Sequence, residues 1–455
     1  MCGILAKTKQ ASLSSNSRYL TGKEVVCDQN LLKLSEGILR VGIVGAGLSG
    51  LVCAERALSH PGLSVEIFEK ERDVGGLAGY VLFGGLKVAK TYHHVLSNDL
   101  HLQKELKRLN ISIDWKKVKV AFYAKSKIYS FNGPLDLLRF EPLRFADRLR
   151  LGWLVLRAKY DDHLLDTSLK DWITSTAGEN VFDVFVDPLI STYFGSSDNI
   201  SAAYLANRWR MESRSANTLG YADFPRLIDE YRSRISSSPS GRILTGCEIS
   251  YVRIAPDHVI INLGDKEQNF DAVVMTCPPK EAGSLLRGVP QSLLNTLKAV
   301  RYRGCLCAAL RFEQKLSEYY WINILDKKLP FVACFEFANL GSLISGGLVY
   351  LVSYVDTDSA LWQCSDQEVI QRFVEGLKSM FRSVPRIREW CLFRTLNGTP
   401  VYEVGYRNVD LNPFPRLYFA GVYRAFPEIR SSGPALRTGI ETAERIVKDW
   451  SLGML

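Results

Sequence analysis

The run GIVGAGLSGL at residues 42–51 constrains the fold more than any other part of the chain. The apolar residues 41–44 lead into Gly45, Gly47 and Gly50, which have the spacing G-x-G-x-x-G, and a helical pattern follows. In such a turn the first glycine permits a tight bend and the second lets a pyrophosphate approach the backbone. The third lets the helix pack on the strand. The free N–H groups and dipole of the helix start favour phosphate. The sequence therefore predicts a βαβ unit that binds a dinucleotide.

A carboxylate ends the second predicted strand, residues 64–70. Glu69 lies 24 positions after Gly45 (69 − 45), where a carboxylate accepts hydrogen bonds from ribose hydroxyls and disfavours a 2′-phosphate. Two features favour FAD over NAD. A glycine pair at 75–76 follows this strand directly, and residues 415–450 read as a strand, a loop and an amphipathic helix of the kind that closes on a flavin. The sequence therefore predicts FAD as the cofactor.

The bulk composition is that of a globular protein with more than one domain. The chain has 455 residues, is 47% hydrophobic and carries a formal charge of +9, which is densest at 139–160. That balance suits an acidic ligand such as a diphosphate, or an anionic membrane surface. The longest apolar stretch, 346–355, is too short for a bilayer span, and the start has no signal-peptide core. We expect a cytoplasmic protein, at most peripheral to a membrane.

The cysteines do not form a metal motif. The ten cysteines include no C-x-x-C pair, and no Cys/His cluster has zinc spacing, so we expect no metal site. Several of them stand inside apolar runs, as free buried thiols do, which favours a reducing compartment.

Three strings together, GAGLSGL, EIFEKERDVGGLAG and YHHVLSND, resemble the flavin-containing amine oxidase superfamily. Its branches include protoporphyrinogen oxidase, phytoene desaturase and UDP-galactopyranose mutase. The likeness spans roughly residues 40–450, with specific motifs only at the two ends of that span. It implies an α/β fold in which a Rossmann-type FAD-binding domain of the GR2 type is joined to a mixed α+β substrate domain.

The resemblance also implies a discontinuous layout. After an N-terminal extension, 1–38, the FAD-binding domain comprises 39–97, 221–284 and 406–455, and the substrate domain comprises 98–220 and 285–405. Within the FAD-binding domain we expect residues 241–254 and 257–264 to form a small antiparallel sheet, because apolar and polar residues alternate in both. Residues 269–279 are expected to rejoin the Rossmann sheet, with a proline pair ending the strand.

The residues expected to contact FAD come from the glycine turn, the strand end, the histidine segment and the C-terminal loop. By similarity, Ile249 touches the adenine through its backbone, and Val422 stands where many relatives carry an aspartate that contacts the flavin chain. No histidine or cysteine lies in a covalent attachment motif, so the FAD is expected to be noncovalent. The full set is Gly45, Ala46, Gly47, Leu48, Ser49, Gly50, Glu69, Lys70, Gly76, Leu77, Ala78, His93, His94, Ile249, Gly421, Val422, Arg430, Ser431 and Leu436.

The segment KTYHHVLSND at 90–99 places two histidines side by side in a chain with six. Adjacent side chains on an extended segment point to opposite faces, which disfavours a shared metal and lets at most one of them face the flavin. His94 matches a histidine that lies close to the flavin in mutase-type relatives. It is also a candidate general base, since an unperturbed imidazole has a pKa near 6.5. The alternative is that His93 and His94 are both packed or surface loop residues.

Two further groups have alternative interpretations. Arg208, Arg210 and Arg214 are either ligands of an anionic substrate group or a solvated cluster. The apolar residues around 140–154 form a membrane face, a substrate channel or, as the default, an ordinary core-packed helix face. They are Phe140, Leu143, Phe145, Leu149, Leu151, Trp153 and Leu154.

The function implied by the resemblance is an FAD-dependent oxidoreductase that removes a hydride from a small or amphiphilic organic substrate. The alternative is a redox-neutral, flavin-dependent nucleotide-sugar mutase, which the His94 match and the basic residues favour. Against it, the C-terminal loop lacks the arrangement that mutases carry after the last strand. The expected partner is a small-molecule substrate rather than a nucleic acid, and the sequence does not indicate an oligomeric state.

Overall fold

The computed structural model describes residues 37–158, 162–214, 217–341 and 345–455. The body of the chain, Leu39–Leu455, forms one compact unit. The predicted N-terminal extension falls outside the described residues apart from its last two positions.

A five-stranded parallel sheet carries the predicted dinucleotide turn. Its strands come from distant parts of the sequence, yet all run in the same direction. Four of the strands are mostly buried, as expected for a parallel sheet that is covered on both faces, whereas the edge strand at 241–245 is half-exposed. In spatial order the strands are β10 (Gly241–Thr245), β2 (Leu63–Glu69), β1 (Leu39–Val44), β14 (Ala272–Met275) and β21 (Leu417–Phe419).

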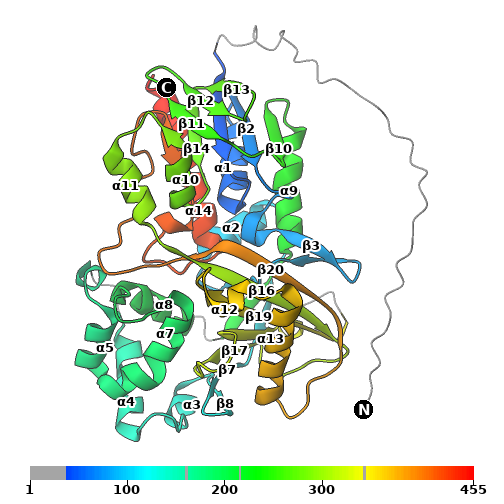
Figure 1. The fold of residues 1–455 in the computed structure, drawn as a ribbon, viewed down its shortest axis with the longest axis vertical. Coiled ribbons are helices and arrows are strands. Elements are labelled where there is room, and N and C mark those ends of the chain that lie inside the picture. Colours follow the sequence, from blue (N-terminus) through cyan, green and yellow to red (C-terminus); the bar gives the residue numbers. More distant parts are fainter. Residues whose placement is uncertain (1–36, 159–161, 215–216, 342–344) are drawn as a thin grey trace. The chain divides into compact units, whose positions relative to one another are not determined.

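The first and last helices of the body pack together on this sheet. Figure 1 shows α1 (Leu48–Leu58, blue) beside α14 (Ser432–Ser451, red), and the two share a core with the sheet. The contact is close, because a Cβ at Gly439 would lie 2.4 Å from the carbonyl oxygen of Ser49. The C-terminal helix therefore packs beside the helix that follows the glycine turn, as the sequence predicts.

One sheet prediction is wrong. Residues 241–254 do not form a single strand of an antiparallel sheet, because a left-handed turn at Gly246 (φ +63°) divides them. The first part, β10, pairs in parallel with β2 at the edge of the five-stranded sheet. Alternation of polar and apolar residues marks a half-exposed strand, and an edge strand of a parallel sheet meets that description as well as an antiparallel strand does.

The second part does form the small sheet. β11 (Tyr251–Ile254) pairs antiparallel with β12 (Val259–Asn262), with β13 (Glu267–Phe270) and β15 (Leu286–Arg287) at the edges. Helices α10 (Pro279–Leu285) and α11 (Gln291–Ala299) pack against each other beside it.

A seven-stranded mixed sheet forms the other half of the body. Helix α13 (Asp366–Met380) covers one face, and its capping box, Ser365 with Glu368, begins the helix. The other face packs on helices formed by residues 98–220. In order the strands are β20 (Ile387–Pro400), β16 (Tyr302–Phe312), β19 (Gly347–Val355), β18 (Ala333–Glu336), β17 (Trp321–Ile324), β7 (Val120–Ala124) and β8 (Lys127–Ser130). The helices on that face are α4 (Phe145–Arg157), α5 (Leu169–Ala177), α7 (Asp187–Phe194) and α8 (Ala202–Arg214).

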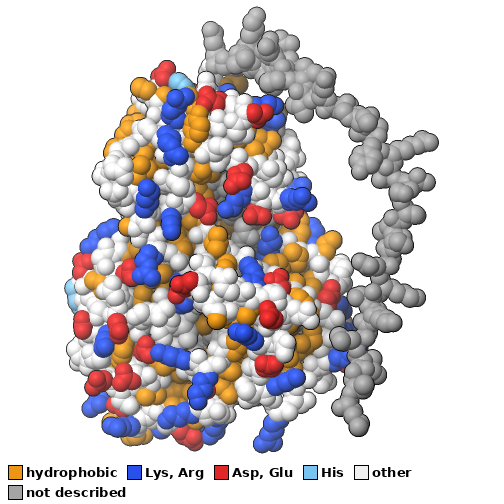
Figure 2. Space-filling view, in the orientation of Figure 1, with side chains coloured by type: hydrophobic (Ala, Val, Ile, Leu, Met, Phe, Trp, Pro, Cys, Tyr) orange, Lys and Arg blue, Asp and Glu red, His pale blue; other side chains and the backbone are white. Residues whose placement is uncertain are grey.

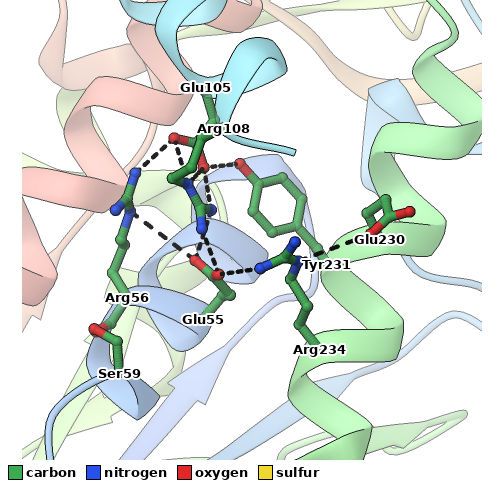
Figure 3. A network of polar contacts seen from close by, with 8 residues as sticks. All are labelled: Glu55, Arg56, Ser59, Glu105, Arg108, Glu230, Tyr231 and Arg234. Atoms are coloured by element: carbon green, nitrogen blue, oxygen red, sulfur yellow. Dashed lines mark hydrogen bonds and ion pairs between the residues drawn. The ribbon is translucent and has the colours of Figure 1, made fainter. Parts of the chain in front are cut away.

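An ion-pair network joins three helices that share a core with the parallel sheet. Glu105 on α2 (Leu100–Arg108) accepts hydrogen bonds from Arg56 on α1, Arg108 on its own helix and Tyr231 on α9 (Phe224–Ser237) (Figure 3). Glu55 of α1 completes it by accepting two hydrogen bonds from Arg108. The network connects α2, which begins just after the histidine segment, to α1, which follows the glycine turn.

The apolar residues around α4 divide into two groups. Phe140, Leu143 and Leu151 are buried, and Leu154 is half-buried against the same core, as the core-packing interpretation expects. Phe145, Leu149 and Trp153 are instead 63%, 51% and 60% exposed. Across the described residues, none of the helices is both long and apolar enough to cross a membrane. Basic and acidic side chains are interspersed over the face seen in Figure 2.

Candidate flavin site

A cavity of about 970 Å³ lies at the carboxyl ends of the parallel strands and extends to the seven-stranded sheet. Open α/β sheets bind ligands at this edge. One end is lined by the glycine turn and by Glu69, and the other by side chains of β16, β17 and β19. The two sheets therefore contribute to one continuous site.

Each of the three glycines of the turn has a different structural reason to lack a side chain. Gly45 has φ +106°, and a Cβ there would lie 2.7 Å from the hydroxyl oxygen of Thr276. A Cβ at Gly50 would lie 2.1 Å from the carbonyl oxygen of Gly45, so the helix approaches the strand closely. A Cβ at Gly47 would meet no atom within 4 Å, and Gly47 lines the cavity. The space beside Gly47 is thus open where a pyrophosphate is expected.

Glu69 is held in place by the backbone around it. Its carboxylate accepts hydrogen bonds from the N–H of Ala46 at 2.7 Å and from the N–H of Glu71 at 2.9 Å. The side chain lies at the end of β2 and lines the cavity. A carboxylate has about four lone-pair sites, so two remain for ribose hydroxyls.

The two histidines line the cavity from different sides. His93 stacks on Phe224 of α9 (ring centroids 4.5 Å apart), and its Nε2 lies 3.2 Å from the carbonyl oxygen of Leu77. His94 lies on the side of the seven-stranded sheet, where its Nδ1 is 3.0 Å from the hydroxyl of Tyr320. The side chains diverge, as alternation along an extended segment requires.

Burial weakens the basicity of both histidines, including His94, the candidate general base. Burial lowers the pKa of His93 to about 4, although its hydrogen bond to the Leu77 carbonyl opposes the shift. Burial, with a smaller effect of His93, also lowers the pKa of His94 to about 4. Both imidazoles are therefore neutral at pH 7 and too weakly basic to hold a proton there. Among the described residues, no cluster of three or more metal-ligating side chains occurs.

The C-terminal loop closes the cavity. Gly421, Val422, Arg430 and Ser431 all line it, whereas Leu436 is buried in the core of the FAD side. Ala46 and Gly50 also lie behind the cavity wall. The remaining residues of the expected set line the cavity: Leu48, Ser49, Lys70, Gly76, Leu77, Ala78 and Ile249.

The three candidate substrate arginines do not act as a group. Arg208 is 5% exposed and lines the cavity, where it donates to Glu212 at 2.8 Å. Arg210 does not line it and donates instead to Asn207. The side chain of Arg214 lies outside the described residues.

Several aromatic wall residues gave no signal in the sequence. Apart from Tyr92, which precedes the two histidines, they come from helices and strands of the middle of the chain, where no motif marks them and where a period-two or helical pattern does not distinguish a cavity wall from a core. The main ones are Tyr92, Tyr193, Tyr204, Trp321 and Tyr354.

The site fits a flavin dinucleotide on two observations. The opening beside Gly47 and the preorganised Glu69 match a pyrophosphate and a ribose, and the cavity continues past them for a further ring system. The start of α14 also borders the cavity, which Ser432 and Ala435 line, and the positive end of a helix dipole favours an electron-rich ring edge.

Comparisons with known proteins concern the family and the fold of the chain. The model of the family described as flavin-containing amine oxidoreductases matches residues 48–447. Protoporphyrinogen oxidase 2, chloroplastic/mitochondrial, of Arabidopsis thaliana is 25% identical over 258 residues, which are 52% of this chain and 50% of that protein. The match thus spans about half the length of this relative.

Solved structures share the fold. A proposed protoporphyrinogen oxidase from Exiguobacterium superposes with a TM-score of 0.73 at 15% identity, covering 91% of this chain and 99% of the other. Reduced UDP-galactopyranose mutase superposes with a TM-score of 0.71 at 15% identity, covering 90% and 94%. Similarity at this level of identity concerns the fold, and it includes both an oxidase and a mutase.

Proposed function

The chain belongs to the family of flavin-containing amine oxidoreductases, and from this premise we propose that it removes a hydride from a small or amphiphilic organic substrate. FAD is the cofactor. When bound, it supplies the hydride acceptor, which no protein side chain can provide. The observation that carries the proposal is the continuous cavity, which joins the dinucleotide turn at Gly47 to the aromatic wall formed by Trp321 and Tyr354.

The chain's own residues position the substrate and exclude water. The wall opposite the dinucleotide turn is mostly apolar, and Tyr92 stacks on Phe335 behind it with ring centroids 3.8 Å apart. His94 is neutral and paired with Tyr320, so we assign it an orienting role in the wall rather than proton abstraction.

We propose that the FAD-holding part of the chain consists of 39–97, 221–284 and 406–455. All five strands of the parallel sheet come from these segments, and all seven strands of the mixed sheet come from 98–220 and 285–405. Two helices of the latter segments, α2 and α11, nevertheless pack into cores on the FAD side.

The proposal is tested first by the flavin itself. The purified protein is expected to be yellow, and denaturation should release FAD into the supernatant because the attachment is noncovalent. A colourless protein that cannot be reconstituted with FAD would contradict the proposal.

Redox behaviour distinguishes the proposed oxidoreductase from the mutase alternative. An oxidoreductase bleaches its flavin when it receives its substrate without oxygen. A mutase works only after the flavin has been reduced, and it transfers no net electrons to product. Turnover of a nucleotide sugar by the dithionite-reduced protein, with none by the oxidised protein, would favour the alternative.

We also propose that the protein is cytoplasmic and contacts anionic membranes peripherally through the outer face of α4. Phe145, Leu149, Trp153 and Leu156 follow helical spacing, and Leu156 is 82% exposed. The only acidic residue of α4, Asp147, is 4% exposed, while Arg144, Arg150 and Arg157 are exposed beside the apolar positions. Apolar side chains flanked by arginines suit an anionic lipid surface.

Vesicle sedimentation tests the membrane proposal. The protein should pellet with phosphatidylcholine vesicles that contain phosphatidylglycerol and not with phosphatidylcholine alone. The double variant Leu149→Ser/Trp153→Ser should lose this binding, and Leu82→Ser, at a position 75% exposed on a distant hairpin, should keep it. If the double variant instead changes the oligomeric state, the face is an interface between two copies.

A further inference from the structure

A half-buried cation without a hydrogen-bond partner among the described residues lies in the cavity wall. The guanidinium of Arg430 lies over the rings of Tyr193, Phe194 and Tyr354, at 5.1, 5.6 and 4.5 Å from their centroids. Among the described residues no group accepts a hydrogen bond from it, and its Nη1 is fully buried. Ring faces stabilise a guanidinium only partly, and the N–H donors of the buried Nη1 are costly when they have no acceptor.

A second arginine faces the same ring. Arg208 lies over Tyr193 at 5.3 Å and over Trp321 at 5.8 Å, and it forms an ion pair with Glu212 on its own helix. Two guanidiniums therefore lie over the ring of Tyr193 within the cavity. Among the described residues, Glu212 pairs with Arg208, and no carboxylate pairs with Arg430. The local excess is about one positive charge.

The surroundings indicate what the missing anion is attached to. Tyr193 comes from α7, Tyr204 from α8 and Tyr354 from β19, and Cys305 and Val352 extend the wall with small apolar groups. A diphosphate carries more charge and needs more donors than this wall offers. A carboxylate matches one guanidinium in charge and can pair with it in a planar, bidentate geometry. The aromatic walls favour a ligand whose remaining part is apolar or aromatic.

We infer that Arg430, with Arg208 beside it, forms an anion subsite for the carboxylate of an organic acid, whose apolar body packs on Tyr193 and Tyr354. The inference rests on the proposed function and narrows its substrate class to carboxylates. It also reassigns Arg430, which the sequence suggests as a flavin contact, to the substrate side of the cavity.

Ligand titration of the FAD-loaded protein tests the inference. Benzoate and phenylacetate are compared with benzamide and benzylamine, which have similar rings without an anion. Binding is followed by the perturbation of flavin absorbance and by the thermal midpoint. We expect at least one of the two carboxylates to bind, and to bind about tenfold or more tightly than its neutral and cationic analogues. No preference for the carboxylates, or no binding of either, would overturn the subsite.

Variants locate the subsite. Arg430→Gln should retain its flavin and bind carboxylates about tenfold or more weakly than the parent. Arg430→Lys keeps the charge but not the planar guanidinium, so its carboxylate affinity should lie between those of the parent and of Arg430→Gln. Arg386→Gln, at a side chain 82% exposed, is the matched control and should bind as the parent does. A colourless Arg430→Gln protein beside a yellow control would place Arg430 in the cofactor site and contradict the inference.

The two proposals fail in distinguishable ways. If the chain holds no flavin at all, the proposed function fails. The subsite is then still tested by the thermal midpoint alone, because benzoate should raise it for the parent and the Arg386→Gln protein but not for Arg430→Gln.

Discussion

At the scale of single residues, the glycines of the first turn differ in what they tolerate. Gly50 is confined by the backbone of Gly45, so any side chain there displaces the helix from the strand. Gly47 has an ordinary φ of −68° and open space on its cavity side. A substitution at Gly50 should therefore affect folding, whereas one at Gly47 should affect ligand binding.

Replacing Gly47 with valine should abolish FAD binding without unfolding the protein. The valine side chain fits the backbone but occupies the space expected for the pyrophosphate. We expect bound flavin below about one tenth of the parent value, by absorbance, with an unchanged circular dichroism spectrum. Gly133→Val, at another glycine with open space, should remain yellow. Retention of flavin by Gly47→Val would refute the assignment of the turn.

The half-buried histidines of the cavity should make the protein sensitive to acid. In the unfolded chain an imidazole gains its proton near pH 6.5, whereas the pKa of His93 and of His94 in the folded protein is about 4. The unfolded state therefore binds more protons between these values, and the free energy of unfolding falls as the pH drops from 6.5 towards 4. Each histidine contributes at most roughly 1.4 kcal/mol per pH unit.

Denaturant titrations at several pH values would measure this slope. The variant His93→Gln cannot gain the proton, so its stability should fall less steeply below pH 6.5 than that of the parent. His258→Gln, on a surface turn, is a suitable control because its position is outside the cavity. Identical slopes for the His93→Gln variant and the parent would show that His93 does not resist protonation.

At the scale of elements, the packing of α1, α2 and α9 depends on a charged cluster as well as on apolar contacts. Glu105 is 2% exposed and accepts from Arg56, Arg108 and Tyr231, which belong to these three helices (Figure 3). Removing one partner from a buried ion-pair network leaves the others without compensation, which costs more than the network contributes when it is intact.

Glu105→Gln should destabilise the protein by about 3 kcal/mol, because two arginines lose their shared carboxylate. Urea denaturation of the FAD-loaded protein gives this difference. Glu141→Gln breaks the exposed pair with Lys127 and should have a much smaller effect, because surface ion pairs contribute little. Equal effects of the two substitutions would mean that solvent reaches the Glu105 cluster.

At the scale of the whole molecule, the cavity is enclosed by both sheets, and its ligand is expected to link them. Residues of β1 and β2 line one end, and residues of β16, β17 and β19 line the other. A molecule that binds the folded chain alone stabilises it in proportion to the logarithm of its concentration.

Removal of FAD should therefore lower the thermal midpoint, and added FAD should restore it. At a hundredfold excess over its dissociation constant the ligand contributes about 2.7 kcal/mol. Calorimetry of flavin-depleted protein with increasing FAD measures this shift. A midpoint that does not respond to FAD would mean that the cavity does not hold the cofactor.

Local features were predictable because they depend on neighbouring residues. The glycine spacing predicts the turn at Gly45, and the pair Gly84 and Gly85, both with positive φ, forms the turn of the hairpin between β3 (Tyr80–Phe83) and β4 (Leu86–Ala89). The apolar runs that become β1 and β14, and the helix α14, also follow from short-range patterns and lie where the sequence places them.

The sequence by itself therefore determined the dinucleotide-binding unit, because a backbone that turns at glycine and a helix that starts there are properties of about ten adjacent residues. Only the tertiary structure decided the substrate end of the cavity. Tyr193 and Tyr354 are 161 positions apart (354 − 193) yet both lie against Arg430. Burial likewise decided the neutral state of His94 and the exposed face of α4. Burial and charge pairing depend on which distant segments meet, and no local pattern encodes that.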